Sequence, residues 1–124
     1  MNGRAMVSTL CLFLALISPA GATTVVRVLG SGDDIRFDRR SIPAEIQTGY
    51  RALTQFCLEC HGEERIITTL RTGKSPVTRQ PYGEREFREK IVKVLRSSKT
   101  DLNRDAAKEL LHFFTYLINR TRIE

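Results

Sequence analysis

Large aromatic side chains and methionine are scarce in this sequence. It contains no tryptophan, and only 7% of its 124 residues are aromatic, so part of its apolar interior must come from other groups. The two methionines, Met1 and Met6, leave the rest of the chain without a thioether sulfur to offer a metal. The longest apolar stretch, Met6–Ile17, has 12 residues, whereas a helix needs about 20 to span a bilayer. That stretch is therefore too short for a spanning helix.

The same stretch has the features of a secretory signal peptide. One positive charge, Arg4, precedes it, Ser18–Pro19 ends it, and Ala20–Ala22 supplies the small residues of a cleavage site. We expect residues 1–22 to be removed as a signal peptide rather than kept as a membrane anchor, and Cys11 leaves with them. The mature protein is then expected in the periplasm or otherwise outside the cytoplasm, without membrane attachment.

The mature chain is moderately basic. Without Arg4 it has 19 basic residues against 14 acidic ones, a net charge of +5. This charge suits docking on an acidic face of a protein partner. Basic and acidic residues alternate, as in Glu84–Lys90, instead of forming a basic block, and we therefore expect no nucleic acid partner.

Residues 23–40 are expected to form an N-terminal extension. Thr24–Leu29 favours β-structure, residues 30–34 favour a turn, and residues 35–37 alternate between apolar and polar. The extension is therefore either a small hairpin or a flexible arm. We assign no chemistry to it.

Residues 41–124 are expected to form a small all-α domain of three to four helices. The first helix begins near Ser41, the second spans about residues 84–96, and Asn103 is the N-cap of the third. A looser stretch from Gly62 to Gly83 and a loop at residues 97–101 separate them. The apolar stripes are Ile46, Gly49, Tyr50, Leu53 and Cys57; Phe87, Ile91, Val94 and Leu95; and Ala106, Leu110, Phe113, Phe114 and Leu117.

The chemistry is concentrated in the segment Cys57-Leu58-Glu59-Cys60-His61. Two thiols separated by two residues can each form a thioether to a vinyl carbon of one porphyrin, and His61 then supplies an imidazole nitrogen to the iron. Such attachment takes place outside the cytoplasm, which export would satisfy. We predict one covalently attached haem c, held by Cys57, Cys60 and His61, with His61 as the ligand to the iron.

Three other uses of this segment are weaker. A disulfide between cysteines three residues apart is strained and closes almost no loop. A thioredoxin-type redox pair needs a βαβ setting, and the sequence around the motif is helical instead. A structural zinc site needs four ligands, and the mature chain has no second pair of cysteines. Its only cysteines and histidines are Cys57, Cys60, His61 and His112, so a closed zinc site would need His112 from the last helix.

Residues 43–119 resemble class I cytochromes c. The pattern Gly49-x-x-x-Leu53-x-x-x-Cys57-x-x-Cys60-His61-Gly62 is similar to the N-terminal helix and haem site of that family, and Leu110–Leu117 is similar to its C-terminal helix. The resemblance implies a small helical fold around one haem, with Gly49 at the crossing of the two helices. It does not cover residues 23–40, and Glu63–Arg65 replaces the Gly-rich run usual after the motif.

Most members of that family place a methionine sulfur on the far side of the iron, which this chain cannot do. Lys99 lies in the loop where the family carries that methionine, but a lysine must lose its proton to bind iron, at a cost of roughly 4–5 kcal/mol at pH 7. His112 is neutral more readily, but it points about 200° away from Leu110 around the helix, toward solvent. Water or a vacant position is the remaining choice. Without methionine we expect a lower reduction potential than is typical of the family.

These features favour an electron-transfer protein over an enzyme, since the sequence contains no separate acid, base or nucleophile constellation. It would be a free carrier or the haem subunit of a redox complex, docking on a redox partner with an acidic face. An alternative is a gas-binding or sensing cytochrome with a five-coordinate haem. A third is a structural subunit whose residues 23–40 dock on a larger enzyme. The far-side ligand distinguishes the first two functions.

Overall fold

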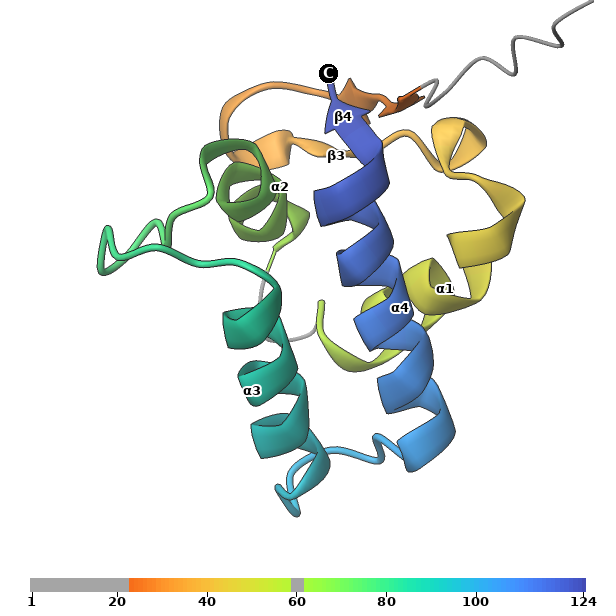
Figure 1. Cartoon of the computed structure of the whole chain (residues 1–124), viewed down its shortest axis with the longest axis vertical. Helices are drawn as coiled ribbons and strands as arrows, with labels where there is room; N and C mark the ends of the chain where they lie inside the picture. The colour runs from red at the N-terminus through yellow and green to blue at the C-terminus, as the bar shows by residue number, and fades with distance from the viewer. Residues whose placement is uncertain (1–22, 59–61) are drawn as a thin grey trace, which may run out of the picture.

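The structure is a computed structural model that describes residues 23–58 and 62–124. The expected signal peptide, residues 1–22, lies outside the described residues. The described part contains four α-helices and four short strands (Figure 1). None of these helices is long and apolar enough to cross a membrane. The helices are α1 (Gln47–Phe56), α2 (Glu63–Thr72), α3 (Glu84–Leu95) and α4 (Arg104–Arg120), and the strands are β1 (Thr24–Val26), β2 (Val28–Leu29), β3 (Arg36–Phe37) and β4 (Thr121–Ile123).

Helices α1 and α4 cross in close contact (Figure 1). A Cβ atom placed on Gly49 of α1 would lie 2.5 Å from the carbonyl oxygen of Glu109 and 2.5 Å from the Cβ atom of Phe113, both on α4. Only the hydrogen of glycine fits this space. Leu53 and Leu110 are fully buried on the two helices. Gly49 therefore lies at a crossing of the first and last helices, as the resemblance implied.

Helices α3 and α4 pack along one another as the two later stripes predict. The ring of Phe87 stacks on the ring of Phe114, with centroids 4.2 Å apart. The Gly83 N–H donates to the Glu86 carboxylate over 2.8 Å at the start of α3. The side chain of Asn103 accepts a hydrogen bond from the Ala106 N–H over 2.9 Å, which confirms the expected N-cap of α4.

The expectation of a loose stretch from Gly62 to Gly83 is wrong for the first half of that stretch, where helix α2 forms. Glu63 and Glu64 lie in the first turn of this helix, where the helix dipole favours negative charge. Gly73 ends it with a left-handed backbone, φ +65°, and its N–H donates to the Thr69 carbonyl. β-Branched residues make the segment a weak helix former, and burial of Ile67 in the core offsets that weakness.

Two small pairs of strands form near the two ends of the described residues. They add β-structure to the expected all-α fold, and the described part is mostly helical. Strands β2 and β3 pair antiparallel, so residues 23–40 contain the hairpin and not the flexible arm. Strand β1 pairs in parallel with β4, with Val26 opposite Ile123, a contact that the sequence did not predict. Val26 and Phe37 are buried in the same core as the helices.

We predict that Gly49→Ala destabilises the protein. The new methyl group would overlap Glu109 and Phe113, and overpacking of this kind costs about 1–3 kcal/mol, more than the roughly 1 kcal/mol that alanine gains over glycine in a helix. Urea unfolding followed by circular dichroism measures the difference. Gln55→Ala, on the exposed side of the same helix, is the control and should change stability by less than about 0.5 kcal/mol. A Gly49→Ala protein as stable as the parent would contradict the close crossing.

Candidate functional site

Cys57, the first predicted attachment residue, is positioned by the end of α1. Its backbone N–H donates to the Leu53 carbonyl over 2.9 Å, so it continues the last turn of the helix. It lies one turn after fully buried Leu53, and its side chain is half-buried. The other two predicted site residues, Cys60 and His61, lie outside the described residues.

The surroundings of Cys57 along the chain suit an apolar group. Phe56, Cys57 and Leu58 are all half-buried and pack against the hydrophobic core. Across the described ranges, Thr69 is the one buried polar or charged side chain, and its hydroxyl is satisfied by the Arg65 carbonyl. A porphyrin attached at Cys57 would therefore extend an existing apolar region, and among the described residues it would leave no buried charged group without a partner. The described neighbours of Cys57 along the chain are therefore compatible with the predicted cofactor.

Glu63 anchors the chain just after the motif. Its carboxylate accepts one hydrogen bond from the Tyr50 hydroxyl over 2.8 Å and another from the Phe37 N–H over 2.6 Å. The start of α2 is thereby tied both to α1 and to β3. The chain is held on the near side of the motif by α1 and on the far side by Glu63. Sequence reasoning noted Glu63 only as a departure from the family pattern, because neither partner is near it in the sequence.

The Tyr50 hydroxyl is held as a hydrogen-bond donor. Burial, and then the hydrogen bond to the negatively charged Glu63, raise the pKa of Tyr50 well above its ordinary value. The hydroxyl consequently keeps its proton further into alkaline pH than an ordinary tyrosine does, and it continues to donate to the carboxylate there. The ring of Tyr50 also packs beside Phe37 and Phe113, with centroids 6.0 and 6.1 Å away. This residue joins the motif helix to the strands through both its ring and its hydroxyl.

Both candidates for the far side of the iron are exposed. Lys99 lies in the loop between α3 and α4, where its backbone N–H donates to the Ser97 hydroxyl over 3.2 Å. His112 lies on the solvent side of α4, as its helical position predicts, with its ring 6.3 Å from that of Tyr116. Within residues 23–58 and 62–124, no group of three or more histidine, cysteine and acidic side chains could hold a metal ion.

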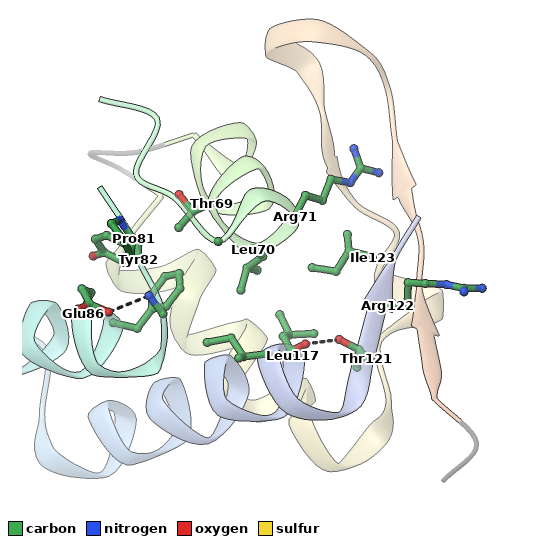
Figure 2. Close-up of a pocket in the computed structure, with 14 residues that line it drawn as sticks. Thr69, Leu70, Arg71, Pro81, Tyr82, Glu86, Leu117, Thr121, Arg122 and Ile123 are labelled. Atoms are coloured by element: carbon green, nitrogen blue, oxygen red, sulfur yellow. Dashed lines mark hydrogen bonds between the residues drawn. The ribbon is translucent and has the colours of Figure 1, made fainter. Parts of the chain in front are cut away.

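A cavity of about 530 Å³, whose lining does not include Cys57, lies between the end of α2, the start of α3, and the junction of α4 with β4 (Figure 2). Leu70, Leu117 and Ile123 face it, while the charged ends of Arg71 and Arg122 extend outward. Its residues come from three separate parts of the sequence, so no local pattern could predict it. It contains no nucleophile or metal-ligating cluster, and we assign it no chemistry.

Comparisons with known proteins identify no family for this chain. No protein-family model matches it, and no curated protein and no solved structure is significantly similar. Inference about its function therefore rests on its own residues and their arrangement.

We predict that Glu63→Ala lowers the free energy of unfolding by about 2–3 kcal/mol, because it removes a charged acceptor from two hydrogen bonds. The matched control is Glu64→Ala. Glu64 occupies the same first turn of α2 and experiences the same helix dipole, but within the described residues its carboxylate accepts one long hydrogen bond, from the Thr68 hydroxyl at 3.4 Å. We expect the control to lose less than about 0.5 kcal/mol in the same urea titration. Equal losses in the two variants would show that the helix dipole, and not the two hydrogen bonds, is responsible.

Proposed function

We propose that the protein is an exported, single-haem c-type cytochrome, similar to class I cytochromes c, that transfers electrons between redox partners. It would act as a free carrier or as the haem subunit of a redox complex. The observation that carries the proposal is the Cys57-x-x-Cys60-His61 motif behind an apolar leader. The helix crossing at Gly49 supports it, since the motif helix and the last helix would meet this way in that family.

Each residue of the motif has a distinct role in this proposal. Cys57 and Cys60 would hold the porphyrin through two thioethers, and His61 would bind the iron on its near side. When bound, the haem supplies the reversible one-electron change. The chain contributes rigidity. The crossing at Gly49 and the two hydrogen bonds of Glu63 hold both sides of the motif segment in place.

A second candidate function is gas binding by a five-coordinate haem. It is favoured by the exposure of Lys99 and His112, the two side chains that are candidates for a far-side ligand. No methionine follows residue 22 to replace them. The third idea, a docking arm at residues 23–40, has less support, because β1 already pairs with β4 of the same chain.

The first test is covalent haem attachment. We predict that the full chain, produced in a host that attaches haem c in its periplasm, retains haem after denaturation, and that Cys57→Ala combined with Cys60→Ala loses it. Haem staining of a denaturing gel, checked by the intact mass, measures this directly. Cys11→Ala is the matched control and should retain haem, since Cys11 belongs to the expected leader. Covalent haem in the double variant, or none in the parent, would refute the proposal.

The second test separates the two functions. For an electron carrier we predict a low-spin optical spectrum of the purified holoprotein, and a reduced spectrum that carbon monoxide leaves unchanged. A high-spin spectrum that shifts with carbon monoxide would instead favour gas binding. If the spectrum is low-spin, conversion to high-spin by Lys99→Ala or by His112→Ala identifies the far-side ligand. A high reduction potential, which is typical of Met/His ligation, would contradict Lys99 and His112 alike as the far-side ligand.

A further inference from the structure

Strand β4 leaves one of its edges open. Within the described residues it pairs with β1 alone. The Glu124 N–H donates to the Val26 carbonyl over 3.0 Å and the Val28 N–H to the Glu124 carbonyl over 2.7 Å, so the backbone groups of Glu124 face β1. Successive residues of a strand present these groups to opposite sides, so the N–H and carbonyl of Ile123 face away from β1. That side is an unpaired strand edge, which can bind another extended chain.

The chain itself occupies parts of the neighbouring edges. Just past β1, on its far side, the Asp38 N–H donates to the Arg27 carbonyl and the Arg27 N–H to the Ser41 hydroxyl, each over 2.8 Å. On β3, the Phe37 N–H donates to the Glu63 carboxylate over 2.6 Å. In the described ranges no such bond reaches the outer edge of β4. That edge is therefore available to a partner.

The open edge borders the cavity of about 530 Å³. All three residues of β4 belong to its lining, and Figure 2 shows Ile123 pointing toward the cavity while Arg122 points away from it. Side chains of a strand added to this edge would alternate in the same way, because residues opposite one another in a sheet point to the same face. Those opposite Thr121 and Ile123 would enter the cavity, and the one between them would lie on the outer face beside Arg122.

The cavity suits apolar side chains. Leu70, Leu117 and Ile118 are part of its lining. The Thr121 hydroxyl already donates to the Leu117 carbonyl over 2.6 Å, and the Glu86 carboxylate already accepts hydrogen bonds from the start of α3. A cavity of this volume falls in the range of roughly 300–1,000 Å³ that is usual for binding pockets. It has room for two large apolar side chains that lie two residues apart on one strand.

The charge at the edge favours an acidic residue between those two apolar ones. The charged ends of Arg71 and Arg122 extend outward from the cavity (Figure 2). The Arg122 side chain is 71% exposed and pairs with Glu124 over 2.7 Å. An ion pair this exposed contributes little to stability, and a guanidinium has five N–H donors, so a second carboxylate can bind it. A residue opposite Arg122 is therefore most favourable when it is acidic.

A second copy of the chain fits this site less well. Its β4 would bring Ile123, whose side chain already packs against its own core. Its Thr121 hydroxyl is likewise bonded to its own Leu117 carbonyl. Neither side chain is free to enter the neighbouring cavity, so pairing of two β4 strands would leave both cavities unfilled. An extended segment with unburied apolar side chains would occupy the edge and the cavity together.

We propose that the outer edge of β4 and the cavity beside it form a binding site for an extended segment of another protein. The segment adds to β4 as a strand, places two apolar side chains in the cavity and sets an acidic side chain beside Arg122. Main-chain hydrogen bonds give the affinity, and the cavity selects the alternate side chains. The site holds no reactive group and needs none. This binding goes beyond electron transfer and does not require the haem.

The probe for the test is a fluorescein-labelled peptide of nine residues, with leucine, glutamate and leucine at its centre and serine or threonine elsewhere. Fluorescence anisotropy measures its binding to the full purified chain. We expect a dissociation constant on the order of 100 µM, as suits a short added strand with two apolar side chains. A parent chain that does not bind the peptide at about 1 mM would overturn the proposal.

Two methylated peptides test the strand pairing itself. One carries N-methyl groups on both leucines, and the other carries them on glutamate and on the residue two positions after it. An N-methyl group removes the N–H donor, and only alternate N–H groups of an added strand face β4. One peptide should therefore bind at least about tenfold more weakly and the other less than about threefold. Which peptide loses affinity distinguishes parallel from antiparallel addition. Equal losses would show that no strand forms.

A matched pair of variants tests the cavity. Ile118 on α4 and Val92 on α3 are 37% and 38% exposed, and of the two only Ile118 lines the cavity. We expect Ile118→Ser to weaken binding of the peptide about fivefold, because apolar contact is lost, and Val92→Ser to weaken it less than about twofold. Circular dichroism checks that both variants fold. Equal weakening by the two substitutions would place the peptide elsewhere and overturn the assignment.

A third comparison tests the charge. Arg122→Gln should weaken binding of the glutamate peptide about threefold and leave binding of a peptide with glutamine in its place unchanged. An equal effect on both peptides would contradict the contact with Arg122. Sedimentation of the parent chain examines the other occupant. A dimer that Ile118→Ser converts to a monomer would put a second copy at the site and refute the peptide.

The outcome is separable from that of the proposed function. Peptide binding by a parent chain that carries no covalent haem would sustain this site while refuting the cytochrome. A chain that carries haem but fails the peptide tests would refute this site and leave the cytochrome standing.

Discussion

The close crossing of α1 and α4 at Gly49 is the constraint on which the rest of this structure depends. Because position 49 has no side chain, the two backbones approach until Phe113 lies beside Tyr50 and Phe37. These three rings join α4, α1 and β3 in one cluster, so a sequence with few aromatic residues places three of them at this crossing. The direction of α1, and with it the place of Cys57, follows from this contact.

The segment after the motif is organised by a charge and not by flexible glycines. Glu63 replaces the Gly-rich run that class I cytochromes c would carry, and its two hydrogen bonds join α2 to α1 and to β3. A carboxylate at the start of a helix is favourable in its own right, because of the helix dipole. The departure from the family pattern therefore has a structural reason, and it leaves the haem proposal resting on the motif itself.

Local patterns in the sequence determined much of this protein. The bounds of α3 and α4, the Asn103 cap and the solvent side of His112 follow from helical periodicity and capping, which act within a few residues. The motif and the missing methionine are likewise legible in the sequence alone. Only the tertiary structure decided the rest. Helix α2 forms because Ile67 is buried against distant elements, β1 finds β4 at the opposite end of the chain, and Glu63 finds Tyr50 and Phe37. Each of these contacts joins residues far apart in sequence, where periodicity carries no information about the partner.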